Sequence, residues 1–564
     1  MSTLFVNHQK TLTGALDAIR SRGYWSAYPE VPSGKIYGEN ARAEGDAAYQ
    51  ARLNRRFELD MPGEDGWLGA EASPYGPSLG VKYPRVKLDA LIHGAREAFA
   101  QWKRLDVQTR IGICLEILDR LNKHSFEMAN AVMHTTGQGW MMAFQAGGPH
   151  AQDRGLEAVA YSWDSMQRTP PDATWTKRVG RDETVTLQKH YRIVPRGIAI
   201  TIGCSTFPTW NSYPGIFASL ATGNVVIVKP HPNAILPLAI TVAVARDVLR
   251  EQGIDPNVIM LAADTREQPI TKELVMRPEV GIIDYTGGSA FGEWIETNAT
   301  HARIYTEKAG VNSVILDSVE NIKAVTGNLA FTFCLYSGQM CTTSQNVFVP
   351  KDGIMAGGAP LSFDEICSAI VKAIDWLLSE PARATEILGA INSDATAKRI
   401  DEAAAAGGTV VRQSQAISNE QFPDARVRTP LIVAVDADDE HLYMREMFGP
   451  IIYIIKTRDT DHSLEIATRA AREHGAITCA IYSTDQAVLE QAEEGCADAG
   501  VALSCNLTGS IWVNQAAAFS DFHVSGANPA GNATLTDTAF VAQRYNVVQS
   551  RIPVAVEAPV ASAS

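Results

Sequence analysis

Five short apolar runs in the first half of the chain are separated by segments with helical periodicity. They lie at residues 198–202, 225–228, 258–262, 281–285 and 304–306. Strands that are apolar on both faces and alternate with helices indicate a parallel sheet covered on both sides. Such sheets bind ligands at the carboxyl ends of their strands. The pattern therefore predicts an α/β fold whose site residues lie at these strand ends.

A second α/β region begins near residue 310, with strands expected at 314–316, 347–349, 431–433, 451–455 and 478–481. A chain of 564 residues is too long for one ordinary core, so at least two domains are expected. Residues 24–86 show poor periodicity and are predicted to form an irregular extension over the surface. A strand pair near 180–195 is either a solvated edge or a contact with another subunit.

Charge and cysteine content exclude several classes of protein. The chain has 49 basic and 63 acidic residues and a net charge of -14, which disfavours nucleic acid as a partner. Its eight cysteines follow no paired short spacing, so reduced thiols in the cytoplasm are expected rather than a disulfide scaffold. The sequence shows neither a secretory leader nor an apolar run long enough to span a membrane, which predicts a soluble protein.

Cys341 is the candidate nucleophile. It ends the segment Gly338-Gln339-Met340-Cys341, and small polar residues follow at 342–344. If this thiol opens a helix, its pKa would be lowered and its own amide could donate to an oxyanion. A buried structural cysteine is the commoner fate of this residue type, but the neighbouring residues favour the functional interpretation.

Glu307 and Asn211 complete the predicted reaction centre. Glu307 ends the strand at 304–306, where burial would raise its pKa toward that of a working base; a surface ion pair with Lys308 is the alternative. Asn211 follows the strand at 198–202, where its amide could serve an oxyanion or a simple turn. A thiolate can attack an aldehyde, and once hydride has left, a carboxylate can activate the water that releases the acid.

A phosphate site is predicted at the glycines that follow the strand at 281–285. Gly287, Gly288 and Gly292 lie where a helix begins, and helix N-terminal amides bind anions. The segment is not the Gly-x-Gly-x-x-Gly fingerprint, so a plain tight turn is the alternative. Lys229 ends another strand, where it could contact a ribose or a phosphate or simply be solvated.

Glu446 and Phe448 lie in a rigid turn before Gly449-Pro450. The carboxylate could accept from ribose hydroxyls and the ring could pack on a flat heterocycle, although either residue could be structural. The histidines stand singly, none at metal-ligand spacing with cysteines, so no metal is predicted. No Gly-x-Ser-x-Gly elbow occurs, which disfavours a serine hydrolase.

Together these motifs resemble the aldehyde dehydrogenase superfamily over roughly residues 88–550. The motifs that carry the resemblance are Trp210-Asn211, Val228-Lys229-Pro230, Thr286-Gly287-Gly288 with Gly292, Glu307, Gly338-Gln339-Met340-Cys341 and Glu446-Met447-Phe448-Gly449-Pro450. The resemblance implies a modified Rossmann dinucleotide domain (88–309), an α/β catalytic domain (310–510) and a β oligomerisation arm. Residues 1–87 would be an N-terminal extension, and 511–564 a return segment with an oligomerisation tail.

The resemblance also implies a role for each site residue. Cys341 would be the nucleophile, Glu307 the base for deacylation, and Asn211 with the Cys341 amide the oxyanion site. The implied cofactor contacts are Lys229 and His231 near the adenine ribose, Thr286, Gly287, Gly288 and Gly292 at the pyrophosphate, Glu446 and Phe448 at the nicotinamide ribose, and Pro208 with Trp210.

Some positions depart from the common pattern of the family. Thr209 replaces Pro, Lys308-Ala309-Gly310 replaces Leu-Gly-Gly, and Gly288 replaces Ser. NAD-selective relatives commonly have Glu shortly after the Lys-Pro pair, whereas His231-Pro232 follow here. Without that carboxylate nothing there repels a 2'-phosphate, and Lys229 and His231 could attract one, so NADP is expected and NAD is the alternative.

The long N-terminal extension and the segment 519–523 resemble the phenylacetate-degradation branch, the PaaN-type proteins. That branch implies oxidation of a semialdehyde, CoA-linked in that pathway, by a homodimer or homotetramer. A CoA-acylating dehydrogenase is the nearest alternative, although Glu307 favours release by water. A non-catalytic aldehyde-binding or structural oligomer is the alternative from another class, and the joint presence of Cys341, Glu307 and Asn211 disfavours it.

Overall fold

The five predicted apolar runs form one parallel sheet in the computed structural model, which describes residues 3–181 and 183–554. Its strand order is β7-β6-β5-β8-β9, and the chain reverses direction across the sheet between β5 and β8. Ligands bind at such switch points, outside the carboxyl ends of the strands. The strands are β5 (Ile198–Ile202), β6 (Val225–Lys229), β7 (Ile259–Leu261), β8 (Val280–Thr286) and β9 (Arg303–Glu307).

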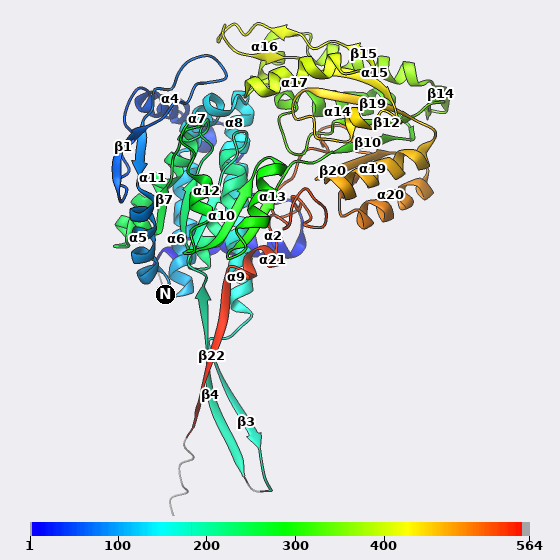
Figure 1. The fold of residues 1–564 in the computed structure, drawn as a ribbon. Helices are drawn as coiled ribbons and strands as arrows, with labels where there is room; N and C mark the ends of the chain where they lie inside the picture. The colour runs from blue at the N-terminus through cyan, green and yellow to red at the C-terminus, as the bar shows by residue number, and fades with distance from the viewer. Residues whose placement is uncertain (1–2, 182, 555–564) are drawn as a thin grey trace, which may run out of the picture.

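Helices cover both faces of this sheet and form the first lobe (Figure 1). The pairs α9 with α10 and α6 with α9 pack closely. The helices are α5 (Leu88–Trp102), α6 (Val107–Lys123), α7 (Ser125–Thr136), α8 (Trp140–Gly147), α9 (Pro149–Gln167), α10 (Pro208–Ala221), α11 (Leu236–Glu251), η1 (Pro256–Val258), α12 (Thr271–Val275) and α13 (Ser289–Asn298).

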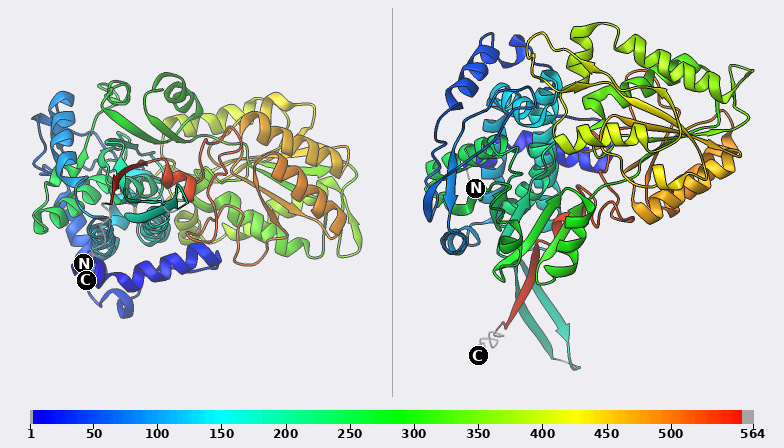
Figure 2. Two further views of the ribbon diagram at one scale, coloured as in Figure 1. Left: turned by 90° about the horizontal axis from the view of Figure 1, so that it is seen from below. Right: turned by 45° about the horizontal axis from the view of Figure 1, so that its top comes forward.

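The N-terminal extension is more regular than predicted. Helices α1 (Thr3–Asn7) and α2 (Gln9–Ser21) pack on α6 and α9, along the outside of the first lobe (Figure 2). The prediction of an irregular segment at 24–86 is wrong in part, because α3 (Gly34–Tyr37), α4 (Ala41–Arg52), β1 (Glu64–Leu68) and β2 (Tyr83–Val86) lie within it. Helix α4 buries only Gly45 and Tyr49, so its sequence lacks an apolar stripe.

The second lobe contains a seven-stranded sheet of order β15-β18-β19-β12-β10-β20-β21, parallel except for β15. Two separate clusters of apolar side chains cover its two faces. The strands are β10 (Ser313–Leu316), β12 (Asn346–Pro350), β15 (Thr409–Arg412), β18 (Leu431–Asp436), β19 (Ile451–Thr457), β20 (Thr478–Tyr482) and β21 (Ala502–Cys505). Each of the five strands predicted in this region is present.

The remaining elements of the second lobe are its helices and two small sheets. The helices are α14 (Ile322–Cys334), η2 (Leu335–Gly338), α15 (Phe363–Leu377), α16 (Pro381–Leu388), α17 (Asp394–Ala405), α18 (Glu440–Tyr443), α19 (Thr460–His474) and α20 (Gln486–Asp498). The small sheets contain β11 (Ser318–Val319), β13 (Ile354–Ala356) and β14 (Ala359–Leu361), and β16 (Ala416–Ile417) with β17 (Val427–Arg428).

An antiparallel arm projects from the body (Figure 1). It contains β3 (Asp172–Arg178), β4 (Thr184–Pro195) and, from the far end of the chain, β22 (Tyr545–Pro553), which pairs with β4. Most of its side chains are exposed. The part of the predicted tail at 555–564 lies outside the described residues.

The C-terminal strand is anchored to the first lobe by a buried ion pair. Arg544, which follows α21 (Thr538–Ala542), donates to both carboxylate oxygens of Asp284 on β8, at 2.5 and 2.8 Å. The guanidinium also donates to Ser219 on α10. Such a bidentate pair fixes geometry, so the return segment at 511–544 is tied to the sheet that carries Glu307.

Candidate active site

Three side chains from distant parts of the chain meet at the carboxyl end of β9. Glu307 ends that strand, Cys341 lies in the turn after η2, and His523 lies in the return segment after β21. Nε2 of His523 is 2.9 Å from Oε1 of Glu307 and 3.5 Å from Sγ of Cys341. The side chains of Glu307 and His523 are each only 2% exposed. The structure thus brings the predicted thiol and carboxylate into one buried site.

Asn211 belongs to the same cluster. It lies in the first turn of α10, and its Nδ2 donates to Oε2 of Glu307 at 2.8 Å. The backbone amide of Asn211 is already used, because it donates to the carbonyl of Phe207. The side-chain amide, predicted to face an oxyanion, therefore holds the carboxylate in this structure. Both oxygens of Glu307 have a nitrogen partner.

Cys341 does not open a helix, so that expectation is wrong. The preceding 3-10 helix ends at Gly338, Cys341 lies in a turn, and residues 342–345, between Cys341 and β12, form no helix. Tyr336 and Ser337 have φ of 51° and 50°, a left-handed conformation that is costly for residues other than glycine. Asn312 donates to the carbonyl of Cys341 at 2.7 Å and so fixes the turn. Backbone strain and this amide, not a helix, set the thiol's position.

The local electrostatics differ from the predictions at both groups. Burial, followed by repulsion from the Glu307 carboxylate, raises the pKa of Cys341 well above its ordinary value. Burial would also raise the pKa of Glu307, but the charge of His523 and hydrogen bonds from His523, Cys341 and Asn211 outweigh it, so this pKa is lowered. A protonated thiol therefore faces an ionised carboxylate at neutral pH.

His523 is the site residue that the sequence did not reveal. Its partners Glu307 and Cys341 lie 216 and 182 residues earlier in the chain, so no local spacing signals the contact. The prediction of no metal rests on spacing in the sequence, which does not reveal that His523 lies beside Cys341 in the fold, and it stays a prediction. Among residues 3–181 and 183–554, Glu307, Cys341 and His523 form a group of three whose donor atoms lie within 4.8 Å of one another.

Lys229 is neither solvated nor free. It is buried at the end of β6, where its Nζ is 2.6 Å from Oδ1 of Asp264 and donates to the carbonyl of Pro230. Burial lowers its pKa, although Asp264 opposes this. Nearby, burial, Arg266 and Lys229 lower the pKa of His231 to about 4. Both groups predicted to attract a 2'-phosphate thus lack a free positive charge at neutral pH.

The predicted phosphate segment joins β8 to α13. Thr286 pairs with Glu307, Gly287 N donates to the carbonyl of Glu307 at 3.0 Å, and Gly288 is the N-cap of α13. A Cβ at Gly288 would meet nothing within 4 Å, whereas one at Gly292 would lie 2.7 Å from the Lys308 side chain. A helix of ten residues therefore begins at the switch point with open space before its N-terminus.

The other predicted contacts come from both lobes. Burial raises the pKa of Glu446 to about 7 while the amide of Gly310 donates to it. Arg399 donates to the carbonyl of Phe448 at 2.6 Å. On α10, Pro208 is the first residue of the helix, and Trp210 meets the His523 ring edge-on at 4.7 Å.

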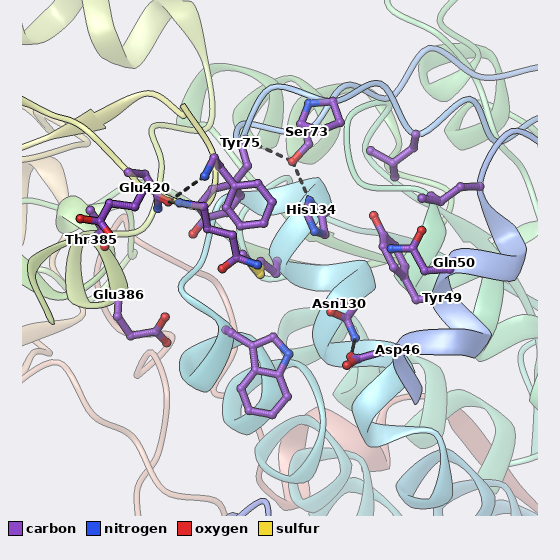
Figure 3. Close-up of a pocket in the computed structure, with 18 of the residues that line it drawn as sticks. Asp46, Tyr49, Gln50, Ser73, Tyr75, Asn130, His134, Thr385, Glu386 and Glu420 are labelled. Carbon is purple, nitrogen blue, oxygen red and sulfur yellow. Dashed lines mark hydrogen bonds between the residues drawn. The ribbon is translucent and has the colours of Figure 1, made fainter. Parts of the chain in front are cut away.

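A large pocket of about 720 Å³ lies elsewhere, between α4, α7 and the segment 381–386 (Figure 3). The close-up shows Tyr49 and His134 facing it from the first lobe, and Glu386 from the second. None of the residues around Cys341 lines this pocket. Size alone therefore does not mark the site of chemistry in this protein.

Comparisons with known proteins settle the family. The family profile described as "Aldehyde dehydrogenase family" matches residues 82–533. The chain belongs to the aldehyde dehydrogenase family. A Burkholderia multivorans structure described as an NAD-dependent aldehyde dehydrogenase is 54% identical, with TM-score 0.97, and the alignment covers 99% of this chain and 100% of that one.

More distant relatives match most of the sequence. The 1-pyrroline-5-carboxylate dehydrogenase of Bacillus subtilis is 23% identical over 448 residues, which cover 78% of this chain and 81% of the relative. The N-succinylglutamate 5-semialdehyde dehydrogenase of Burkholderia multivorans is 25% identical over 433 residues, covering 76% of this chain and 81% of the relative.

Family membership makes this protein an oxidoreductase that converts an aldehyde to an acid with a nicotinamide cofactor. The predicted fold, with its Rossmann-like lobe and α/β second lobe, is confirmed. In the described part of the chain, no helix combines the length and apolar character that a membrane span requires.

The raised pKa of Cys341 predicts how its reactivity varies with pH. A thiol that is protonated throughout the neutral range should react with iodoacetamide about tenfold faster for each pH unit between about pH 7 and pH 9, without a plateau. Alkylation of the cofactor-free enzyme is followed by mass spectrometry, and Cys341→Ala gives the background from the other seven cysteines. A plateau below about pH 8 would contradict the raised pKa.

Proposed function

We propose that this protein oxidises a semialdehyde to a carboxylate through a thiohemiacetal and a thioester on Cys341. The observation that carries the proposal is the contact network in which Glu307 lies beside the Cys341 thiol and is held by Asn211. A nucleophile, a carboxylate base and an amide donor are the groups that this chemistry requires. We also propose the domain limits 88–309 and 310–510, with the site between them.

In the first step, Glu307 takes the proton of the Cys341 thiol, and the sulfur attacks the aldehyde carbon. Asn211 Nδ2 and the backbone amide of Cys341 then donate to the oxyanion, so the Asn211 amide turns from Glu307 to the substrate. The proton stays within the buried cluster, so the net charge of the site does not change in this exchange. The transfer is uphill, because the thiol has a raised pKa and the carboxylate a lowered one, so it is completed only as the sulfur attacks the carbonyl carbon.

The residues at the switch point fit a dinucleotide. The N-terminus of α13, with open space at Gly288, suits a pyrophosphate, and Glu446 and Phe448 suit the nicotinamide ribose and ring. A nicotinamide bound there would supply the hydride acceptor for the oxidation. After its first proton has passed to solvent, Glu307 orients and deprotonates the water that attacks the thioester carbon. The carbon–sulfur bond then breaks, the acid is released, and the Cys341 thiolate takes the second proton back from Glu307.

The names of the relatives support a semialdehyde as substrate class. Those relatives act on a semialdehyde or on 1-pyrroline-5-carboxylate. We propose in addition a CoA-linked semialdehyde of aromatic catabolism, on the resemblance of the extension and of residues 519–523 to the phenylacetate branch. A CoA-acylating reaction is the second candidate, and the ionised Glu307 beside the thiol favours water over CoA as the acyl acceptor.

The local charges lead us to propose NAD rather than NADP as the preferred cofactor. Lys229 is neutralised by Asp264, and a 2'-phosphate near this pair would meet the Asp264 carboxylate. His231 is uncharged at neutral pH because its pKa is about 4. The description of the 54% identical protein as NAD-dependent also supports this preference. Arg266, which is exposed beside His231, is the cation that favours NADP.

The arm supports the proposal of a homo-oligomer. Trp175 is 37% exposed, and Val547, Val548 and Ile552 are also exposed, although an isolated three-stranded arm buries little apolar surface of its own. A homodimer or homotetramer that pairs these strands with a partner would cover them. We further propose that the protein works in the cytoplasm, where its eight thiols would stay reduced.

Variants at Cys341 and Glu307 test the mechanism. Cys341→Ala should abolish oxidation of a semialdehyde while cofactor binding remains. Glu307→Gln should release about one equivalent of reduced cofactor per site, in a phase slower than that of wild type because the thiol has lost its base. Turnover should then be about 10²- to 10⁴-fold slower than in wild type, because no base activates the water. Stopped-flow absorbance of reduced cofactor measures both phases.

Glu293→Gln, an exposed change on α13, is the matched control and should turn over steadily. Free CoA should not restore turnover to Glu307→Gln. Restoration by CoA, with an acyl-CoA product, would favour the CoA-acylating alternative, and steady turnover without CoA would remove Glu307 from the mechanism.

The cofactor preference is tested by the ratio of kcat/KM for NAD to that for NADP. The wild-type ratio should exceed about tenfold, and Asp264→Asn should lower it by about tenfold, because the change removes a repulsive carboxylate. Asp247→Asn, at an exposed position on α11, should leave the ratio unchanged. A wild-type preference for NADP would contradict the proposal.

A further inference from the structure

His523 contacts the two groups between which the proton moves. Its Nε2 lies 2.9 Å from the Glu307 carboxylate and 3.5 Å from the Cys341 sulfur. Because a carboxylate accepts only, Nε2 must carry the hydrogen, in the neutral ring as in the charged one. A single N–H is therefore directed at two atoms that can each bear a negative charge.

The ring makes its polar contacts through this nitrogen. Nδ1 of His523 is buried, and among the described residues it has no hydrogen-bond partner. Trp210 meets the ring edge-on at 4.7 Å and limits its rotation. A buried ring nitrogen without a hydrogen-bond partner costs free energy of folding, which argues against a purely structural role for this histidine.

The backbone around His523 is held in place. His523 and Leu535 exchange two backbone hydrogen bonds of 3.0 and 2.9 Å. Phe519 and Val524, on either side of His523, have φ of 68° and 61°. Left-handed conformations at bulky residues cost energy and persist at functional sites when the surroundings enforce them.

A buried ion pair on α9 holds the backbone of this loop in place. Arg154 and Glu157 are both fully buried and lie 2.8 Å apart. Arg154 donates to the carbonyls of Ala516 and Asp521, while Glu157 accepts from the amide of Phe519. The loop that carries His523 is thus fixed to the first lobe at three points before it enters the site.

The electrostatic surroundings show what the N–H contributes. The groups that act on the Cys341 thiol are Glu307, Cys204 and Glu446, and each opposes its ionisation. Around the imidazole itself, the charged groups are Glu307 on β9 and, beyond the Trp210 ring, Arg154 on α9. A thiolate at Cys341 therefore depends on a hydrogen-bond donor such as His523 Nε2.

We propose that His523 is a catalytic residue whose Nε2–H is shared between Glu307 and Cys341. The hydrogen bond that this N–H donates moves from the carboxylate to the thiolate as the nucleophile forms. In this step the S–H bond of Cys341 breaks, an O–H bond forms on Glu307, and the electron pair stays on sulfur. No oxidant or further reactant is needed. The proposal rests on the proposed function only in taking Cys341 as the nucleophile.

Two matched substitutions of His523 distinguish the effect of the N–H donor from the effect of side-chain size. In His523→Gln the side-chain amide can place its nitrogen near the position of Nε2, whereas in His523→Asn the amide reaches only the position of Nδ1. Each variant is treated with iodoacetamide at about pH 8, without cofactor or aldehyde and with a chelator that removes stray divalent cations. The rate of Cys341 alkylation is then measured by mass spectrometry.

The expected result is alkylation about tenfold slower in His523→Asn and within about threefold of wild type in His523→Gln. Equal rates in wild type and His523→Asn would overturn the proposal, as would a His523→Gln enzyme as slow as His523→Asn. Since no aldehyde is present, failure of the proposed oxidation would leave this result unaffected. Circular dichroism checks that both variants fold.

A measurement on the unaltered protein covers the case in which a variant fails to fold. The chain has 12 histidines, and ¹⁵N labelling of histidine reports which ring nitrogen of each carries hydrogen. The His523 signal, assigned by its loss in either variant or by its shift when Cys341 is alkylated, should show a protonated Nε2 from about pH 6 to pH 9. An unprotonated Nε2 in this range would overturn the proposal.

Discussion

The buried carboxylate of Glu307 is the interaction on which the rest of the site depends. An ionised group with 2% exposure is costly unless each oxygen has a partner, and here Asn211 and His523 supply them. Those two residues come from α10 and from the return segment, so the charge ties both to the end of β9. The same network keeps the pKa of Glu307 low and places the carboxylate against the Cys341 thiol.

This arrangement reverses a common way of activating a cysteine. The thiol is not made acidic by a helix N-terminus, and in the cofactor-free protein its pKa is raised. The base is instead beside it, already ionised, and the proton need travel only within the cluster. Such a site keeps the thiol protonated, and so less open to oxidation, until a substrate draws the sulfur toward its carbonyl carbon.

The sequence predicted the fold well because buried parallel strands leave a clear apolar pattern. All ten predicted strands are present, and Cys341, Glu307 and Asn211 lie together as the family resemblance implied. His523 could not be predicted from spacing, because its partners are far away in the chain. The predicted direction of the Glu307 pKa shift is wrong, because burial was visible in the pattern but the compensating contacts were not. At Cys341 the helix on which a lowered pKa depended is missing.

The N-terminal region shows a related limit of prediction from sequence patterns. Helix α4 has few apolar residues, because close approach at Gly45 replaces an apolar stripe, and its helical period was therefore hidden. The sequence around Lys229 likewise does not reveal its ion pair with Asp264, 35 residues later. That ion pair changes the charge that a cofactor would meet. Tertiary partners of single charged residues are thus the part of a site that sequence reasoning misses most readily.

The most direct test of the account is to observe the acyl group on sulfur. Wild-type protein mixed with a semialdehyde and NAD, quenched in acid within one turnover and digested, should yield the peptide containing Cys341 with the added mass of the acyl group. None of the other seven cysteines should carry it. Reduced cofactor formed in the same time with unmodified Cys341, or with the adduct on another residue, would contradict the central claim.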